Sequence, residues 1–351
     1  MLMPTSYYTV VVLELRDCPK GTSVIYLPGT IPQTHSRQVL QAVVLKRTCI
    51  YTGVPVTVIV MASSTTDTTT TTTAPTREQW DQLCQDVKAA LVKPEMGEES
   101  WYLIIATVLT TSPRPHLLAD FWTYLTTTQP EFSSTEAQTR LSERLRDVLL
   151  KQLTLIGAPQ MLSALIPWAK VQTAGEGKGE EKRGELDLEQ WSQLSFPALH
   201  ARGIETITSI YGTLWPTIFR TFGPHRTEVG FHELAVVYGL YLSDFRVLSA
   251  LETELVAYTC ITAQGLRGPA LWHVRGLGRV LGARGSNDET DRMRRIKDVL
   301  RGVKVAVMHA VEFCGSEMVQ RSRLDGGPDG TQGWPNVGDV VRELGGWGDD
   351  E

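Results

Sequence analysis

Long apolar runs are missing from this sequence of 351 residues. No stretch of about 18 or more uninterrupted apolar residues occurs, which excludes a transmembrane helix and predicts no contact with a membrane. Extreme charge is missing too, because the net charge of -5 gives no general attraction to nucleic acid or to an anionic surface. The sequence therefore predicts a soluble protein that binds neither nucleic acid nor membrane.

Cysteines are few and isolated. They lie far apart and form no CxxC pair, which argues against a disulfide framework, a zinc knuckle and a dithiol redox pair. We therefore expect a reduced, cytoplasmic chain. The five cysteines are Cys18, Cys49, Cys84, Cys260 and Cys314.

The composition is otherwise ordinary. Apolar residues make up 42% and charged residues 21% of the chain, close to an average soluble protein. A chain of this length can bury a sizeable core, either as one large domain or as two ordinary ones.

The first 75 residues differ from the rest. β-Branched runs at 10–13 and 54–61 predict short strands, and the threonine run at 68–73 is of low complexity. Two interpretations stay open. Residues 1–75 are either a poorly structured extension or a small β appendage. The extension could arise from translation upstream of a natural start at Met61, which would leave a mitochondrial location open.

The remainder of the chain has the spacing of helices. Thr76 with Gln79 predicts a capping box, and apolar residues recur at helical intervals from Leu141 to Ile156. Outside residues 1–60 no strand pattern is present in the sequence. The prediction is therefore an all-α fold.

A glycine-rich, charged segment at 173–190 divides this helical part. Such a segment cannot bury an apolar stripe, so we expect an exposed linker. It separates an N-terminal helical half at 76–172 from a C-terminal half at 191–315. Residues 316–351, rich in glycine and acidic residues, are predicted to form a flexible tail.

The residues with the clearest chemical potential are Glu254 and His273. Glu254 falls on the flank of an apolar helical stripe, where burial would raise its pKa. His273 shares a helix face with Leu277 and Val280, so two adjacent antiparallel helices could bring it to Glu254. A Glu–His pair in an apolar cleft can act as a proton shuttle; a structural hydrogen-bonded pair is the alternative. Glu252, further from the stripe, is a secondary candidate.

The spacing around this pair resembles a known family. The pattern Glu254-x11-Leu266-x2-Pro269-x3-His273 is similar to the Glu-x11-Cys-x2-Cys-x3-His pattern of the alkylhydroperoxidase D-like (AhpD-like) and carboxymuconolactone decarboxylase-like family. Residues 141–169, an amphipathic helix that ends in Gly-x-Pro before a second helix, are similar to the family's other signature. Here that signature precedes the Glu/His segment, a layout similar to that of the long fungal members.

The resemblance covers about residues 134–313 and implies an AhpD-like helical bundle, with two halves that could be related. It also implies a homo-oligomer and a small-molecule substrate, with no cofactor. The redox cysteines of the peroxidase members are absent, because Leu266 and Pro269 occupy their positions and neither supplies a thiolate. Thiol peroxidase activity of the peroxiredoxin type is therefore disfavoured.

The decarboxylase branch of the family works without the dithiol pair. The resemblance thus implies a lyase with acid–base chemistry, decarboxylation or isomerisation, on a small organic acid or lactone. Glu254 would be the general acid and base and His273 its partner. Arg267 or Arg275 would hold the substrate's carboxylate, unless both are solvated surface residues.

The second hypothesis is a non-catalytic descendant, an oligomeric binding or scaffold protein. Geometry separates the two hypotheses. An open pocket beside a Glu–His contact within about 4 Å favours the enzyme. A pair closed off inside the core favours the scaffold.

Two further patterns predict no separate site. His232-Glu233 begins like the zinc motif HExxH, but Val236 stands where the second histidine is required, so no metal site is expected. Residues 267–304 hold ten Lys or Arg against four Asp or Glu. A solvated helix face explains this excess better than a nucleic-acid surface.

Overall fold

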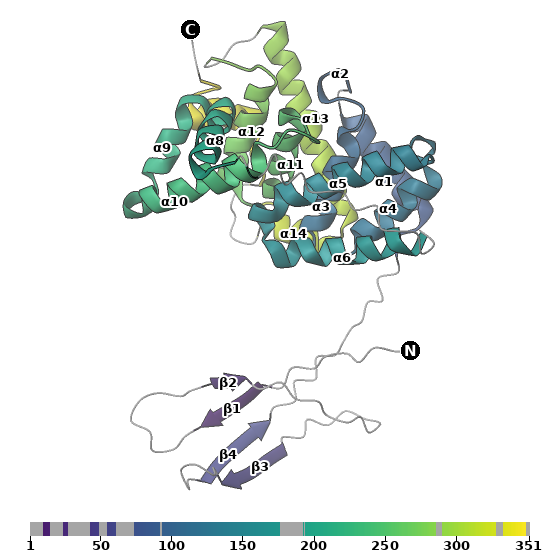
Figure 1. Cartoon of the computed structure of the whole chain (residues 1–351), viewed down its shortest axis with the longest axis vertical. Coiled ribbons are helices and arrows are strands. Elements are labelled where there is room, and N and C mark those ends of the chain that lie inside the picture. Colours follow the sequence, from purple (N-terminus) through teal and green to yellow (C-terminus); the bar gives the residue numbers. More distant parts are fainter. Residues whose placement is uncertain are drawn as a thin grey trace. The chain divides into compact units, whose positions relative to one another are not determined.

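The computed structural model describes residues 10–14, 24–26, 43–48, 55–60, 74–91, 93–175, 192, 194–285, 290–327 and 333–348. The chain divides into two compact units, Met1–Thr73 and Ala74–Glu351. The described elements of the first unit are strands, and those of the second are helices (Figure 1).

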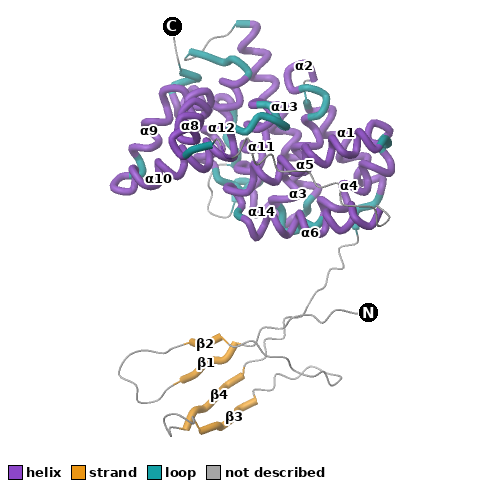
Figure 2. The backbone as a smooth tube through the Cα atoms, viewed as in Figure 1, coloured by secondary structure: helices purple, strands orange, loops and turns teal. Residues whose placement is uncertain are grey.

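The first unit holds a four-stranded antiparallel sheet with the strand order β2-β1-β4-β3 (Figure 2). The two central strands cover the β-branched runs of the sequence and pair with Val11 opposite Val60, as expected of residues that favour extended backbone. The described part of this unit therefore forms a small sheet, where a poorly structured extension was the other expectation. The strands are β1 (Val10–Glu14), β2 (Val24–Tyr26), β3 (Val43–Thr48) and β4 (Pro55–Val60).

The second unit is helical throughout its described part, apart from one isolated β-bridge between Gly285 and Gly348. The all-α prediction is confirmed for this unit. Its helices are α1 (Arg77–Ala90), α2 (Lys93–Met96), α3 (Ser100–Thr111), α4 (Leu117–Thr128), η1 (Pro130–Phe132), α5 (Thr135–Ile156), α6 (Ala158–Gly175), α8 (Phe196–Tyr211), η2 (Gly212–Leu214), α9 (Trp215–Arg220), η3 (Gly223–His225), α10 (Arg226–His232), η4 (Glu233–Leu242), α11 (Ala250–Ala263), α12 (Arg267–Val280), α13 (Asp291–Phe313), α14 (Ser316–Ser322) and α15 (Val337–Leu344).

Helix α3 lies at the centre of this unit. All of its residues are buried, and helices α1, α5, α11 and α13 pack around it. Each buried leucine or isoleucine contributes about 1.5–3 kcal/mol. The hydroxyls of Thr107, Thr110 and Thr111 donate to carbonyls one turn earlier at 2.7–2.8 Å, so these polar groups are buried with partners.

Helices of both predicted halves contribute to the larger of two hydrophobic clusters, and α8, α9 and η4 form the smaller one. Side chains of α1, α3, α4 and α5 belong to the same buried cluster as those of α11, α12 and α13. The predicted linker at 173–190 begins inside α6, which continues to Gly175, and residues 176–191 lie outside the described residues. The chain from Ala74 onward is therefore one body rather than two separate halves.

Helices α8 and η4 approach each other at the backbone. A Cβ atom on Gly203 would lie 1.7 Å from the Leu234 carbonyl oxygen, and one on Gly239 would lie 2.1 Å from the Leu199 carbonyl oxygen. The apolar segment 229–242 is not one continuous α-helix. The structure instead ends α10 early and continues as the π-helix η4, an element that is rare and frequent at functional sites.

The predicted flexible tail at 316–351 is wrong for its described residues. Helices α14 and α15 form there, and two tryptophans hold them to the body. The indole Nε1 of Trp334 donates to the Ser322 carbonyl at 2.8 Å. Trp347 is fully buried against Gly278, where a Cβ would come within 2.1 Å of its ring. Glycine-rich composition suggested mobility, but buried aromatic area outweighs it.

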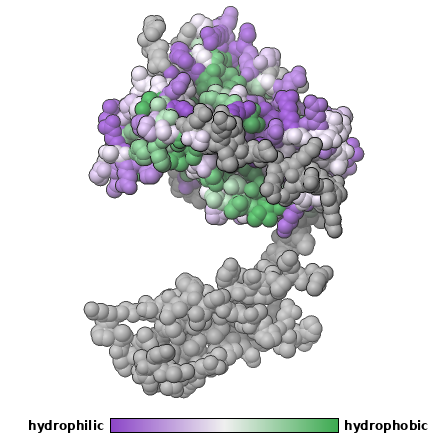
Figure 3. Space-filling view, in the orientation of Figure 1, coloured by the Kyte–Doolittle hydropathy of each residue, from purple (hydrophilic) through white to green (hydrophobic). Residues whose placement is uncertain are grey.

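Apolar side chains also reach the surface of the helical unit (Figure 3). One group lies on α8 and α10, where the rings of Phe196 and Phe231 pack at a centroid distance of 6.3 Å. Ile204 and Val229 are exposed on the same two helices. We call these four residues the α8–α10 patch.

Candidate functional site

Glu254 and His273 meet between α11 and α12. Glu254 Oε1 lies 2.9 Å from His273 Nδ1, and the two residues are 1% and 4% exposed. A tight turn at Gly265, with φ of +72°, reverses the chain between the helices. The sequence-predicted pair is therefore in direct hydrogen-bonded contact, and it is closed off from solvent.

Two tyrosines extend this contact into a longer chain. Tyr211, the last residue of α8, places its Oη 2.8 Å from His273 Nε2. Tyr238 of η4 donates from its Oη to Tyr211 Oη at 2.9 Å. Either ring nitrogen of His273 can carry the ring proton, and each tyrosine hydroxyl can donate or accept, so these contacts allow proton transfer in both directions. We call Glu254, His273, Tyr211 and Tyr238 the buried relay.

Burial sets the electrostatics of the relay. It raises the pKa of Glu254 above its ordinary value, and the charge of His273 and its hydrogen bond only partly oppose the rise. Burial likewise raises the pKa values of Tyr211 and Tyr238. Among the described residues, Glu254 Oε2 has no hydrogen-bond partner. An unpartnered buried carboxylate oxygen is costly, which favours the protonated acid.

A second carboxyl group lies near the other end of the relay. Burial raises the pKa of Glu233, at the start of η4. Its charge in turn contributes to the raised pKa values of Tyr211 and Tyr238. Glu233 and Glu254 are thus two carboxyl groups whose pKa values burial raises and whose charges act on the relay tyrosines.

Gly276 makes the space in which the Glu254 carboxylate sits. A Cβ atom at this position would lie 2.4 Å from Glu254 Oε1 and 2.6 Å from Ile210 Cγ2. Both distances are shorter than any tolerable contact. The Glu254–His273 contact therefore requires a glycine at position 276, one turn after His273.

Arg267 does not join the relay. Its guanidinium donates twice to Glu343 of α15, at 2.9 and 2.7 Å, and lies 3.6 Å from Asp339. The hydrogen bonds from Arg267 hold the pKa of the Glu343 carboxyl at about 2. Arg267 therefore fastens the C-terminal helix to α12.

Arg275 is buried, with its guanidinium away from Glu254 and His273. It donates to the Gly346 carbonyl at 2.8 Å and to the Tyr211 backbone carbonyl at 2.5 Å. It thus joins the C-terminal segment to the end of α8. The two arginines predicted to hold a substrate carboxylate are both engaged in tertiary structure.

Glu252 caps α11. It accepts from the backbone and hydroxyl of Ser249 at 2.9 Å each and from Arg144 at 2.5 Å. Burial alone would raise the pKa of Glu252, but the hydrogen bonds from Arg144 and Ser249 lower it below the ordinary value. This secondary candidate is separate from the relay and ties α11 to α5.

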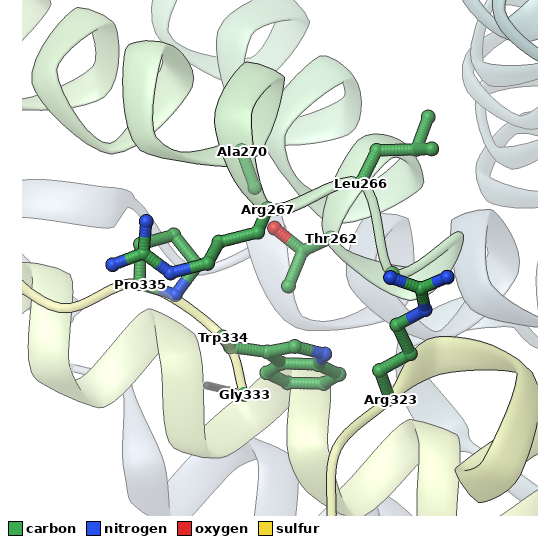
Figure 4. A pocket seen from close by; sticks show the side chains of 9 residues that line it. Thr262, Leu266, Arg267, Ala270, Arg323, Gly333, Trp334 and Pro335 are labelled. Atoms are coloured by element: carbon green, nitrogen blue, oxygen red, sulfur yellow. The ribbon is translucent and has the colours of Figure 1, made fainter. Parts of the chain in front are cut away.

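The positions of the family's cysteines lie at the start of α12, beside a narrow pocket (Figure 4). Its volume of about 10 Å³ holds about one water molecule. Figure 4 shows the Thr262 hydroxyl turned toward Arg267, above the Trp334 ring. Thr262 Oγ1 and Arg267 Nε are buried without a hydrogen-bond partner among the described residues, so one water would satisfy both. Leu266 is half-exposed at the rim.

Cys260, which precedes these positions in α11, does not supply a thiolate. Burial raises the pKa of the Cys260 thiol, whose sulfur lies 3.6 Å from Thr111 Oγ1. A buried neutral thiol is a poor nucleophile.

Sequence reasoning identified half of the relay. Tyr211 and Tyr238 were missed, because they come from α8 and η4 and no spacing in the sequence links them to Glu254 and His273. Aromatic enrichment of these segments was visible, but it does not single out two hydroxyls.

Comparison with known proteins found no match. No protein-family model, no curated protein and no solved structure matches this chain. In the part of the chain that the structure describes, no helix has the length and apolarity to cross a membrane. No group of three or more His, Cys, Asp or Glu in that part is arranged to hold a metal ion.

Proposed function

We propose that this chain is an AhpD-like, carboxymuconolactone decarboxylase-like enzyme that performs acid–base chemistry on a small organic acid or lactone without a thiol or a cofactor. The observation that carries the proposal is the buried relay, four hydrogen-bonded proton carriers that begin at a carboxyl group with a raised pKa. Strongly perturbed groups held in one chain are a mark of proton-transfer sites.

The relay delivers a proton at its Tyr238 end. When the His273 ring proton is on Nε2, protonated Glu254 gives its proton to the unprotonated Nδ1. His273 Nε2 then protonates Tyr211, and Tyr211 protonates Tyr238. The Tyr238 hydroxyl passes its own proton to the carbanion or enolate of the substrate. Abstraction of a substrate proton runs the same chain in the opposite direction.

Tyr238 is the exit because it is the most exposed of the four, although only 7% of it is accessible. A substrate therefore reaches it when η4 shifts from α8. A π-helix suits such a step, since its wider turn is held less firmly than that of an α-helix.

The test is proton exchange catalysed by the purified full chain. A panel of β-keto acids and lactone acids is incubated in D2O, and deuterium uptake and CO2 release are followed by NMR. Glu254→Gln and Tyr211→Phe are expected to lower the rate about 100-fold or more. The exposed Glu205→Gln on α8 is the matched control and should retain the wild-type rate. Equal rates for all variants, or no turnover of any panel member, would reject the enzyme.

The second candidate is the non-catalytic, oligomeric scaffold. The closure of the relay from solvent and the engagement of Arg267 and Arg275 favour it. The α8–α10 patch would then join two copies of this chain, because aromatic residues are enriched in interface cores. Light scattering after gel filtration is expected to give a multiple of 38.9 kDa, and Phe231→Glu should return the chain to a monomer.

The three cysteines in the described part of the chain, Cys84, Cys260 and Cys314, are free. Free buried thiols support the proposal of a reducing, cytoplasmic environment.

A further inference from the structure

A pocket of about 310 Å³ opens at the end of η4, separate from the buried relay. It reaches the lower size limit of pockets that bind small molecules. The residues that line it come from the start of α8 and from the turn between η4 and α11. They are Leu194, Arg202, Leu240, Ser243, Asp244, Phe245 and Arg246.

The turn that forms the floor of this pocket is held by two cations. Lys151 of α5, which is 1% exposed, donates to the carbonyls of Tyr241 at 2.8 Å and Asp244 at 2.5 Å. Arg202 of α8 donates to the Ser243 carbonyl between them at 2.8 Å. Three carbonyls within four residues are thus fixed from two helices, so the pocket is formed before any ligand arrives.

Arg202 keeps donors available for a ligand. Its guanidinium carries five N–H groups, and its one hydrogen bond among the described residues is the bond to Ser243. The neighbouring Arg246 is paired with the side chain of Asp244 at 2.7–2.8 Å. Arg202 is therefore the group in this pocket that can bind an anion by a two-pronged contact.

The charge around the pocket favours an anionic ligand. Lys151, Arg202 and Arg246 face the carboxylates of Asp147 and Asp244, with Asp147 Oδ2 lying 3.8 Å from Lys151 Nζ. Arg146 also acts on Asp147 by its charge, so four cations stand against two anions and the surroundings are net positive. A neutral ligand would leave the remaining N–H donors of Arg202 unpaired, whereas a carboxylate accepts from them.

The remaining wall is apolar. Phe245 is 44% exposed, and Leu194 and Leu240 lie on the same lining. An exposed aromatic ring beside an arginine with free donors suits a ligand with an apolar or aromatic body and one carboxylate.

We propose that this pocket binds a small monocarboxylic acid with an aromatic or branched apolar body, its carboxylate on Arg202 and its body on Phe245. The site does not depend on the proposed acid–base function, because no residue of the buried relay lines it.

Isothermal titration of the full chain with phenylacetate tests the proposal. We expect saturable binding at one site with a dissociation constant on the order of 1 mM, as about ten heavy atoms permit. Acetate lacks the ring and 2-phenylethanol lacks the charge, so each should bind at least about tenfold more weakly. Equal binding of acetate would mean general anion attraction, and equal binding of 2-phenylethanol would mean apolar adsorption; either result overturns the proposal.

Variants then locate the site. Arg202→Gln is expected to weaken phenylacetate binding about tenfold or more, whereas Arg220→Gln, an exposed arginine on α9, should leave it unchanged. Phe245→Glu places a carboxylate at the mouth without disturbing the core and should abolish binding even if Arg202→Gln loosens the turn. Binding that survives Phe245→Glu places the ligand elsewhere and refutes the proposal. Because the relay is untouched, the proton-exchange assay reports separately on the proposed enzyme.

Discussion

Replacing Gly276 by alanine should break the Glu254–His273 contact. The new methyl group would lie 2.4 Å from Glu254 Oε1 and 2.6 Å from Ile210 Cγ2. Overpacking costs about 1–3 kcal/mol, and loss of a charged buried hydrogen bond costs about 1.5–3 kcal/mol. Against these losses, alanine in place of glycine in a helix increases the free energy of unfolding by about 1 kcal/mol. The expected net loss is about 1.5–5 kcal/mol of unfolding free energy.

Urea unfolding followed by tryptophan fluorescence measures this loss. All nine tryptophans lie beyond residue 73, so the signal reports on the helical unit. Gly268→Ala is the matched control in the same helix, because nothing lies within 4 Å of its added Cβ. That variant should be unchanged or stabilised by up to about 1 kcal/mol.

The outcome that would refute the reasoning is a Gly276→Ala variant as stable as Gly268→Ala. A double-mutant cycle sharpens the test. If the clash is with the carboxylate, Gly276→Ala should cost less in a Glu254→Ala background, with a coupling energy of about 1–3 kcal/mol. If the cost is the same in both backgrounds, Ile210 alone resists the methyl group and the carboxylate has room to move.

Three other predictions follow from the same structure. The pKa of Glu254 is raised in the folded state, so its contribution to the free energy of unfolding is greatest below the unfolded pKa. That contribution is lost as pH rises through the folded pKa, by up to about 1.4 kcal/mol per pH unit. Glu254→Gln should remove this pH dependence of stability in urea titrations between pH 4 and about 8. Trp347→Ala should lower stability by about 3–5 kcal/mol, since it leaves a cavity over Gly278; a thermal melt no lower than that of wild type would contradict a packed tail. Arg267→Gln removes a partly exposed ion pair with Glu343 and should cost no more than about 1 kcal/mol in urea, while a larger loss would mean that α15 depends on this one contact.

The sequence was most informative where structure depends on neighbouring residues. The capping box of Thr76 and Gln79 forms as predicted, because both of its hydrogen bonds join positions three apart. The cap of α5 is equally local, because the Ser134 hydroxyl accepts from the Ala137 N–H three residues later. The π-helix was missed because it follows from backbone contact with α8 at Gly203, a residue 30 or more positions away.

In the candidate site, too, contacts between neighbouring helices could be predicted from the sequence, and contacts set by tertiary packing could not. Glu254 and His273 could be paired from the sequence, because a short turn joins their helices and both lie on inward faces. Arg275 could have been excluded by the same geometry, since two residues beyond His273 correspond to about 200° around a helix. It was assigned to the site from proximity in sequence alone, and it lies instead against the C-terminal segment. Tyr211 and Tyr238 depend on tertiary packing and had no local signal.

The choice between enzyme and scaffold turns on what the buried relay costs the fold. A glycine in a helix interior is about 1 kcal/mol worse than alanine, and Gly276 is needed to admit the Glu254 carboxylate. The unpartnered Oε2 adds a desolvation cost of about 1–3 kcal/mol. A helix pair that served packing alone would be more stable with alanine and an apolar side chain at these two positions. A scaffold would have no use for either destabilising feature, the helical glycine or the unpartnered carboxyl oxygen. A proton donor requires a carboxyl group kept neutral by burial. The closure of the relay from solvent argues against an enzyme. The presence of a buried carboxyl group beside a helical glycine argues for a proton donor, and we give this second observation more weight.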